Sequence, residues 1–204
     1  HEPVVVLDDG GLVTELLHSS PKYADVLDKF RIVEQTTGGI IQAEKHPIRA
    51  TLVNVARSLS KQAEGRFIGK SVALRVSRAI ARLGRDLNGS KVAVIGYGTV
   101  GQALAEQLGA KGAKVTIIES NPLRAARARA AGFTVKTKTS VFPGADVVIG
   151  CTGTRTISLE DLALLKDGAI VASASSKRVE IDMEGLTSVA KSRTLVPADD
   201  FETT

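Results

Sequence analysis

The chain has 204 residues, one cysteine and no tryptophan. A single thiol, Cys151, cannot form an intramolecular disulfide, so a disulfide-stabilised extracellular scaffold is excluded and we expect a cytoplasmic location. Long apolar runs are also missing: no run reaches 18 apolar residues, and the opening HEPVVVLDDGG lacks the basic start and apolar core of a secretory signal. We therefore expect no membrane segment and no secretory leader.

Aromatic residues make up only 3% of the chain, although its net charge is +5 and its pI is about 9.4. Basic proteins that bind nucleic acid usually pair their charge with aromatic stacking platforms or a concentrated basic patch. Here the arginines are spread along helical patterns and are better read as solvated helix faces, so we expect no nucleic-acid partner. No His, Cys or carboxylate spacing typical of a metal site occurs around His18 or His46, and no metal is expected.

The second half of the chain alternates between strand and helix patterns. Runs such as VAVI, VTII, VVIG and AIVA are apolar without alternation, which is typical of parallel strands covered on both faces. The pattern predicts a Rossmann-type, doubly wound parallel sheet of the α/β class. The expected strands are 91–95, 114–119, 133–137, 146–150 and 169–173, the expected helices are 100–108, 122–131 and 159–165, and a further helix and strand are expected within 183–196.

A helix is predicted from Ser71 to Leu87, because its apolar residues recur at spacings of three and four, and Asn88-Gly89 should stop it. The first 60 or so residues contain one strand in PVVVLDDGG, a helical stretch to His18 and loops around EQTTGG, which look too few to close a core. We therefore expect part of a second α/β domain at 1–69 and a dinucleotide-binding domain with its leading helix at 70–204. Because the chain opens on His1, we expect it to be a piece of a longer protein.

The stretch KVAVIGYGTVGQ places three glycines between a strand and a helix. Gly96 would allow the tight turn, Gly98 would let a pyrophosphate approach the backbone, and Gly101 would permit close packing of helix and strand. Thr99 and Val100, at the predicted start of the helix, are further candidates for cofactor binding, because the free amides and positive dipole end of the helix would face the phosphates. The spacing predicts a dinucleotide site.

The next strand, in VTIIES, ends 18 residues after Gly101 in Glu119. A carboxylate there would accept hydrogen bonds from an adenosine ribose diol and would repel a 2′-phosphate, so NAD is predicted over NADP. The segment GCTGT follows another strand, and its Thr152 and Gly153 are further candidates for cofactor binding. Cys151 is expected to be a packing residue, because no His lies close to it in sequence.

Together these segments resemble the adenosylhomocysteinase (S-adenosylhomocysteine hydrolase) family over nearly the whole chain. LDDGGLVTELLH is similar to the family's LDDGGDLT, EQTTGG to EETTTG, GSKVAVIGYGTVGQ to GKVAVVAGYGDVGKG, and VTIIESNP to VIITEIDP. CTGTRTISLEDLALLKDGAIV and VEIDMEGL also resemble family segments, in the same order. The order and number of these matches make the resemblance specific.

The resemblance implies an NAD-dependent cycle on an adenosine-type substrate, in which the ribose 3′-hydroxyl is oxidised transiently and a thiol is eliminated and replaced by water. It implies catalytic roles for Asp9 and for Lys61 in RSLSK, and cofactor contacts for Thr36 and Thr37. It also implies a homo-oligomer, tetrameric in the family. Lys61 is equally readable as an ordinary surface lysine.

The chain departs from the family at its substrate positions. Gln35 stands where the family has a glutamate, and Ser176 in SASSKRVEID where GHFDVEID has a histidine. Gly65 and Arg66 stand where an aspartate and an asparagine follow the lysine. An amide cannot take up a proton as a carboxylate does, and a serine does not titrate near neutrality, so these differences argue against hydrolysis of the usual substrate.

Three hypotheses follow. The first is an NAD-dependent, adenosylhomocysteinase-like enzyme acting on an adenosine-type nucleoside or thioether. The second is a non-catalytic NAD-binding regulator or partner protein of the same family. The third, a dehydrogenase related to the 2-hydroxy-acid enzymes, shares the sheet and glycine loop but is disfavoured by the DDGG and EQTTGG segments.

Overall fold

The computed structural model describes residues 2–175 and 179–192. These residues form two compact units. The N-terminal unit consists of the chain up to Gly84 together with Thr99–Leu108, and the C-terminal unit of Arg85–Gly98 together with the chain from Gly109 onward. The domain boundary at residue 70 that the sequence suggests stays a prediction.

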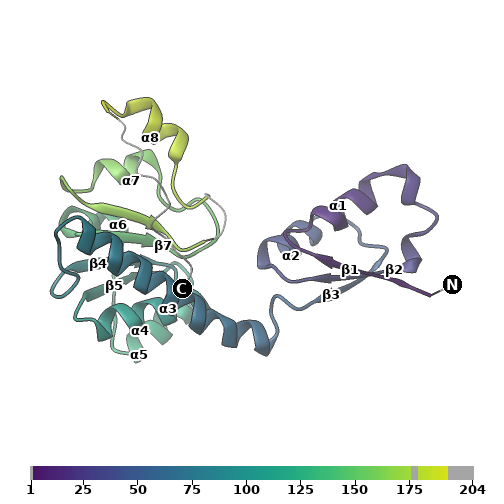
Figure 1. The fold of residues 1–204 in the computed structure, drawn as a ribbon, viewed down its shortest axis with the longest axis horizontal. Coiled ribbons are helices and arrows are strands. Elements are labelled where there is room, and N and C mark those ends of the chain that lie inside the picture. Colours follow the sequence, from purple (N-terminus) through teal and green to yellow (C-terminus); the bar gives the residue numbers. More distant parts are fainter. Residues whose placement is uncertain (1, 176–178, 193–204) are drawn as a thin grey trace. The chain divides into compact units, whose positions relative to one another are not determined.

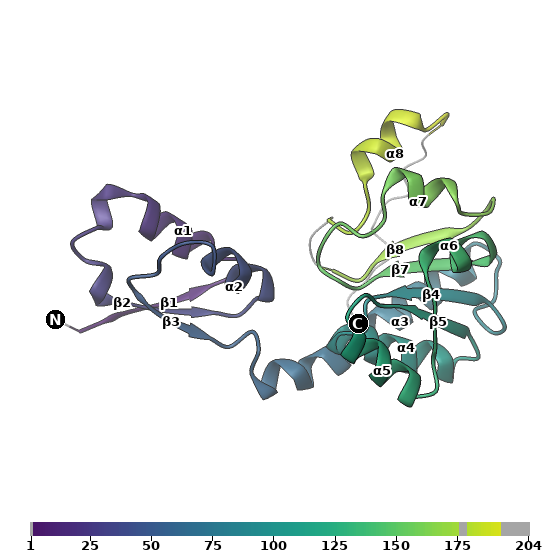
Figure 2. The same cartoon turned by 180° about the vertical axis from the view of Figure 1, so that it is seen from behind.

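The N-terminal unit contains a three-stranded parallel sheet with strand order β1-β2-β3. Its elements are β1 (Val4–Asp8), α1 (Leu12–Ser19), η1 (Pro21–Tyr23), η2 (Leu27–Lys29), β2 (Phe30–Glu34), α2 (Thr37–Ala43) and β3 (Thr51–Asn54). In such a consecutive parallel order, right-handed crossovers place both helices on the same face, where α1 and α2 lie (Figures 1 and 2).

This small sheet has a core of its own. Leu17 of α1 packs with Leu27, Ile32 and Ala50, all at most 7% exposed. Strands β2 and β3 and the start of α2, which the sequence does not predict, complete this core on one face of the sheet, and the assignment of 1–69 to part of a second domain stays a prediction.

Helix α3 (Leu59–Arg82) is longer than the sequence predicts and has different ends. It begins where the Ser58 hydroxyl accepts a hydrogen bond from the Lys61 backbone N–H at 3.3 Å, so Ser58 is its N-cap. It ends at Arg82, followed by Gly84 with φ of +68°. The predicted stop at Asn88-Gly89 is wrong: Gly89, with φ of +76°, belongs to the turn that enters the next strand.

Helix α4 (Thr99–Ala110) packs closely against α3. A Cβ at Gly65 would lie 2.3 Å from Thr99 Cγ2, and one at Gly69 would lie 2.6 Å from Ala103 Cβ. Both glycines are buried. They thus let the first turn of α4 approach the α3 backbone, as two helices do where small residues meet.

The C-terminal unit contains a five-stranded, all-parallel sheet with strand order β6-β5-β4-β7-β8, of which Figure 2 labels β5, β4, β7 and β8. The chain proceeds outward in both directions from β4, which is the doubly wound Rossmann topology, so the predicted fold class is confirmed. The strands are β4 (Lys91–Ile95), β5 (Lys114–Ile118), β6 (Thr134–Val135), β7 (Val147–Gly150) and β8 (Ile170–Ser173). The carboxyl ends of these strands lie at one edge, where ligands bind in such sheets.

One face of this sheet packs its core against the segments that follow β6 and β7. Ala93, Ile95 and Val148 contact Phe142 and Ile157, which are fully buried. The remaining elements of the unit are α5 (Pro122–Ala130), α6 (Lys138–Val141), η3 (Phe142–Gly144), α7 (Leu159–Ala163) and α8 (Met183–Val189). The helix expected within 183–196 is therefore present as α8, and the strand expected after it falls largely outside the described residues. Among the residues described, no helix has the length and apolarity needed to cross a membrane.

Candidate functional site

The glycine loop lies between the end of β4 and the start of α4. Gly96 has φ of +96°, and a Cβ there would lie 2.9 Å from Thr152 Cγ2, so both backbone conformation and crowding require glycine. Gly98 differs: its φ is not left-handed, and a Cβ there would meet no atom of the described residues within 4 Å. Neither conformation nor a protein neighbour explains this glycine, whereas the approach of a dinucleotide phosphate to the backbone does.

Helix α4 follows the glycine loop in the chain and carries the other residues that the sequence predicts to contact the phosphates. Thr99 is its first residue and is exposed, Val100 is half-buried, and Gly101 is buried within the first turn. The N–H groups of a first helical turn have no partner within the helix and favour an anion. The residues present therefore fit a dinucleotide pyrophosphate.

Glu119 lies directly after β5 and is held by two backbone amides. Its Oε2 accepts a hydrogen bond from Tyr97 N at 2.7 Å, and its Oε1 accepts one from Asn121 N at 2.8 Å. A carboxylate has about four acceptor positions, so two remain for other donors. Because the Tyr97 amide belongs to the glycine loop, the predicted ribose-binding carboxylate is fixed next to the predicted phosphate-binding turn.

Thr152 and Gly153 lie in the loop after β7, and both are exposed. The backbone N–H groups of both residues donate hydrogen bonds to Glu180, whose side chain is buried and 0% exposed. The sequence does not predict Glu180 as a site residue, because its partners are 24 to 28 residues away in the chain. The one local signal is an acidic residue between the apolar Val179 and Ile181.

Cys151, in the same loop, is not suited to nucleophilic chemistry. Burial, with the nearby negative charge of Glu180 as a second cause, raises the pKa of its thiol to about 12. The thiol is thus protonated at neutral pH, as suits a packing residue.

The predicted substrate residues Asp9 and Gln35 meet at the carboxyl ends of β1 and β2. Gln35 Nε2 donates a hydrogen bond to Asp9 Oδ2 at 3.2 Å, and both side chains are exposed. The loops that carry them are joined by Glu34, a second buried carboxylate that the sequence analysis missed. Glu34 accepts hydrogen bonds from Gly10 N and Gly11 N on one loop, at 3.2 and 2.8 Å, and from Thr36 on the other.

The two predicted threonine contacts differ in their surroundings. The Thr36 hydroxyl donates to Glu34 at 2.7 Å and accepts from Gly10 N and Gly39 N, each at 3.0 Å. A hydroxyl has one donor and two acceptor positions, so Thr36 is fully engaged as the N-cap of α2. The Thr37 side chain is exposed, and its cofactor contact stays a prediction.

Lys61 lies in the first turn of α3, where its ammonium pairs with Glu64 at 2.6 Å. Its side chain is 32% exposed. The predicted residues divide between the two units: Asp9, Gln35, Thr36, Thr37, Lys61, Thr99, Val100 and Gly101 lie in the N-terminal unit, and Gly96, Gly98, Glu119, Thr152 and Gly153 in the C-terminal unit. Ser176 lies outside the described residues.

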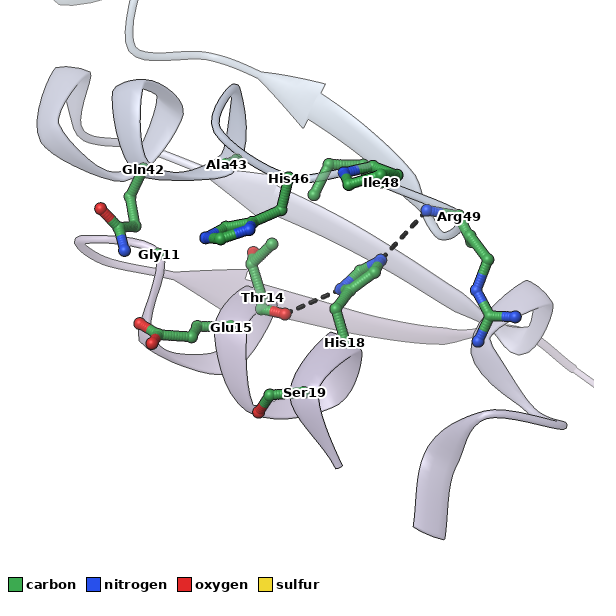
Figure 3. Close-up of a pocket in the computed structure, with 11 residues that line it drawn as sticks. Gly11, Thr14, Glu15, His18, Ser19, Gln42, Ala43, His46, Ile48 and Arg49 are labelled. Carbon is green, nitrogen blue, oxygen red and sulfur yellow. Dashed lines mark hydrogen bonds between the residues drawn. The ribbon is translucent and has the colours of Figure 1, made fainter. Parts of the chain in front are cut away.

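A cavity of about 390 Å³ opens between α1 and the segment that follows α2, and Figure 3 shows its lining. His18 lies at the wall of this cavity. Its Nδ1 forms a hydrogen bond with the Thr14 carbonyl oxygen at 2.7 Å, and its Nε2 accepts one from the Arg49 backbone N–H at 3.1 Å. These bonds connect α1 to the segment that leads into β3. None of the predicted site residues lines this cavity. In the described part of the chain, no group of three or more His, Cys, Asp or Glu residues could hold a metal ion.

The doubly wound sheet, the open side of Gly98 and the fixed carboxylate of Glu119 define a dinucleotide-binding α/β protein. Residues 70–202 match the sequence profile described as S-adenosyl-L-homocysteine hydrolase, NAD binding domain. The chain therefore belongs to the S-adenosyl-L-homocysteine hydrolase family, as its resemblance suggested, and the prediction of NAD as the cofactor is confirmed.

Sequence identities to individual relatives support the same family. The chain is 33% identical to the adenosylhomocysteinase of Sulfurisphaera tokodaii over 202 residues, covering 96% of this chain and 48% of the relative. It is 31% identical to the S-inosyl-L-homocysteine hydrolase of Methanococcus maripaludis, covering 93% of this chain and 46% of that protein. The chain thus spans about half the length of these relatives.

Among solved structures, a dipicolinate synthase polypeptide from Bacillus halodurans is similar with a TM-score of 0.63 and 21% identity, covering 83% of this chain and 59% of that one. At this identity the similarity concerns the fold alone.

Proposed function

We propose that this chain is part of an NAD-dependent enzyme that acts on an adenosine-type nucleoside thioether through transient oxidation of the ribose 3′-hydroxyl. The proposal rests on two features of the glycine loop. The backbone at Gly98 has no protein neighbour where a Cβ would stand and is open to a phosphate, and the Tyr97 amide of the same loop fixes the carboxylate of Glu119. The exposed Asp9–Gln35 pair adds a polar substrate-side surface at the ends of β1 and β2. Family membership makes the thioether the favoured substrate class.

The glycine loop and Glu119 would hold NAD, which would supply a reversible hydride acceptor for carbon 3′. The protein has to remove the hydroxyl proton and then the hydrogen on carbon 4′, which the neighbouring ketone makes acidic, as the thiol leaves carbon 5′. Gln35 cannot accept a proton, so these transfers fall to Lys61 and Asp9. The Gln35 amide, which donates to Asp9, instead holds that carboxylate as an acceptor for a sugar hydroxyl.

A second candidate is a non-catalytic NAD-binding regulator of the same family. The pairing of Lys61 with Glu64 favours it, because an ammonium engaged in an ion pair is not free to reach a substrate hydroxyl. A cytoplasmic location and a homo-oligomeric assembly, tetrameric by resemblance, belong to both candidates.

The test uses the full-length protein with S-adenosylhomocysteine and, separately, S-inosylhomocysteine, and measures the thiol released. We expect release from at least one of them, and a rate lowered about a hundredfold or more by Lys61→Ala, the size expected for loss of a general acid or base. Lys70→Ala, on the same helix, is the matched control and should leave the rate unchanged. Protein that holds NAD but releases no thiol from either substrate would favour the regulator instead.

A further inference from the structure

Glu180 is a fully buried carboxylate whose hydrogen bonds all converge on the loop after β7. Its Oε1 accepts from Thr152 N at 2.7 Å and from Gly153 N at 2.6 Å. Its Oε2 accepts from the hydroxyls of Thr152 and Thr156, each at 2.9 Å. Four donors thus satisfy the carboxylate, and no ion pair to a cation is found for it among the described residues.

The backbone of Glu180 is fixed as well. Its carbonyl accepts hydrogen bonds from Thr156 N and Ile157 N at 3.0 and 2.9 Å, and the adjacent Ile181 forms a parallel bridge with Ile157. On the other side, a Cβ at Gly150 would lie 2.7 Å from Glu180 Oε2. The carboxylate therefore lies against Gly150 at the end of β7 as well as against the loop.

This loop packs against the glycine loop of the NAD site at Gly96. The Thr152 methyl group would lie 2.9 Å from a Cβ at Gly96, and the Cys151 carbonyl oxygen 3.2 Å from it. Glu180 accepts hydrogen bonds from both the backbone N–H and the hydroxyl of Thr152. These bonds fix the position of the Thr152 methyl group next to the turn at Gly96. All of these residues belong to the C-terminal unit.

We propose that Glu180 is a positioning residue for the NAD site: its carboxylate holds residues 151–156 so that Cys151 and Thr152 support the glycine loop at Gly96. The proposal rests on the NAD site and goes beyond the reaction proposed above. An amide in place of the carboxylate would turn an NH2 group toward donors, so at least one hydrogen bond would be lost and the loop would loosen. NAD would then bind only after the loop is ordered again, which weakens its affinity.

The experiment compares Glu180→Gln with Asp146→Asn in the full-length protein. Asp146 is a matched control because it also accepts hydrogen bonds from a backbone amide and a side chain, but lies before β7, at the opposite end of the same strand. The first readout is the dissociation constant of NAD. The second is the alkylation rate of Cys151, the one cysteine of this chain, identified by its peptide mass.

For Glu180→Gln we expect NAD affinity to fall about tenfold or more, the effect of losing one hydrogen bond to a charged group. We also expect Cys151 to be alkylated about tenfold faster or more, because the loop opens and the negative charge beside the thiol is lost. Asp146→Asn should change neither quantity, although it destabilises the sheet. If Glu180→Gln does not fold, Thr156→Val removes one of the four hydrogen bonds and should shift both readouts in the same direction by less.

Unchanged NAD affinity and alkylation in Glu180→Gln would overturn the proposal, and so would equal changes in Glu180→Gln and Asp146→Asn, which indicate general destabilisation. Wild-type protein that binds no NAD would overturn the cofactor site together with the proposal. The two failures are therefore distinguishable.

Discussion

Three carboxylates, those of Asp8, Glu34 and Glu180, are at most 2% exposed, and each is satisfied by backbone amides and threonine hydroxyls. The Asp8 carboxylate accepts hydrogen bonds from the Thr14 backbone N–H and the Thr14 hydroxyl, both at 2.7 Å. Burial is the largest single influence on the pKa of Asp8 and raises it, but the hydrogen bonds together outweigh burial, so the pKa is lowered. Each carboxylate fixes a loop at the carboxyl end of a parallel strand, where ligand contacts are expected.

At the same scale, Gly98→Ala should weaken NAD binding by about tenfold or more, because the new methyl group occupies the open side that a phosphate would need. Gly109→Ala is a matched control. It too lacks a left-handed φ and any neighbour within 4 Å, but it lies near the end of α4. It should leave NAD affinity unchanged and stabilise the helix by about 0.5–1 kcal/mol. Titration calorimetry measures the affinities, and equal NAD affinity in the two variants would contradict the role given to Gly98.

The sequence predicts the local parts of the NAD site well, because Gly96, Gly98 and Glu119 belong to one strand-helix-strand unit with fixed spacing. It does not predict Glu34 or Glu180, whose partners lie up to 24 and 28 residues away by the path of the chain. Burial and hydrogen bonding of a carboxylate depend on the tertiary fold, and a sequence pattern carries no direct signal for them.

At the scale of elements, α3 and α4 form a close pair through Gly65 and Gly69. The pair joins the turn that carries Lys61 to the helix that begins at Thr99. The departure of the chain from the family at position 65 thus has a structural reason as well: a side chain there would clash with Thr99 Cγ2 at 2.3 Å.

Gly69→Ala should destabilise the protein by about 1–3 kcal/mol, because its methyl group would overlap Ala103 Cβ and lie 2.8 Å from the Leu104 backbone nitrogen. In an unobstructed helix the same change would be stabilising, as expected for Gly109→Ala. Thermal and urea unfolding of the two variants check this. A rise in the free energy of unfolding of Gly69→Ala would show that the two helices do not pack closely.

The sheet strands of the second half follow from their apolar runs, and their predicted bounds differ from the observed ones by at most about two residues at each end. The start of α3 does not follow, because two glycines and a polar stretch interrupt the apolar stripe before Ser71. Those glycines face α4 rather than ending the helix. The end of α3 could have been read from Gly84, whose left-handed φ suits a helix stop, in place of Asn88-Gly89.

At the scale of the whole molecule, each sheet is covered differently. In the three-stranded sheet, Val5 and Leu7 alternate with the residues that face α1 and are 64% and 80% exposed. The five-stranded sheet buries every residue of β7. The five-stranded sheet is therefore covered on both faces at β7, and Asp146 lies just before the amino end of this strand.

Asp146 lies at that end and accepts hydrogen bonds from Lys166 at 2.5 Å and Lys91 N at 2.7 Å. These interactions lower its pKa from 3.8, with the Lys166 hydrogen bond as the largest cause. Because the folded-state pKa is below that of the unfolded chain, the ionised carboxylate stabilises the fold above about pH 4 and loses this contribution as the pH falls through the folded-state pKa.

Asp146→Asn should therefore lower the free energy of unfolding at pH 7 by about 1–2 kcal/mol, and the difference from wild type should shrink as the pH falls below about 4. Asp167→Asn, an exposed neighbour, is the control and should change stability by less than about 0.5 kcal/mol. Urea unfolding across the pH range measures both. A difference for Asp146→Asn that stays constant down to low pH would rule out the ionised carboxylate as its source.

The most direct test of the proposed enzyme is the absorbance spectrum of NAD bound to the full-length protein, before and after addition of S-adenosylhomocysteine. Oxidation of the substrate 3′-hydroxyl transfers a hydride to the bound cofactor, so we predict new near-ultraviolet absorbance from reduced nicotinamide. Bound NAD whose spectrum stays unchanged with both S-adenosylhomocysteine and S-inosylhomocysteine would contradict the proposed redox cycle while leaving the NAD site in place.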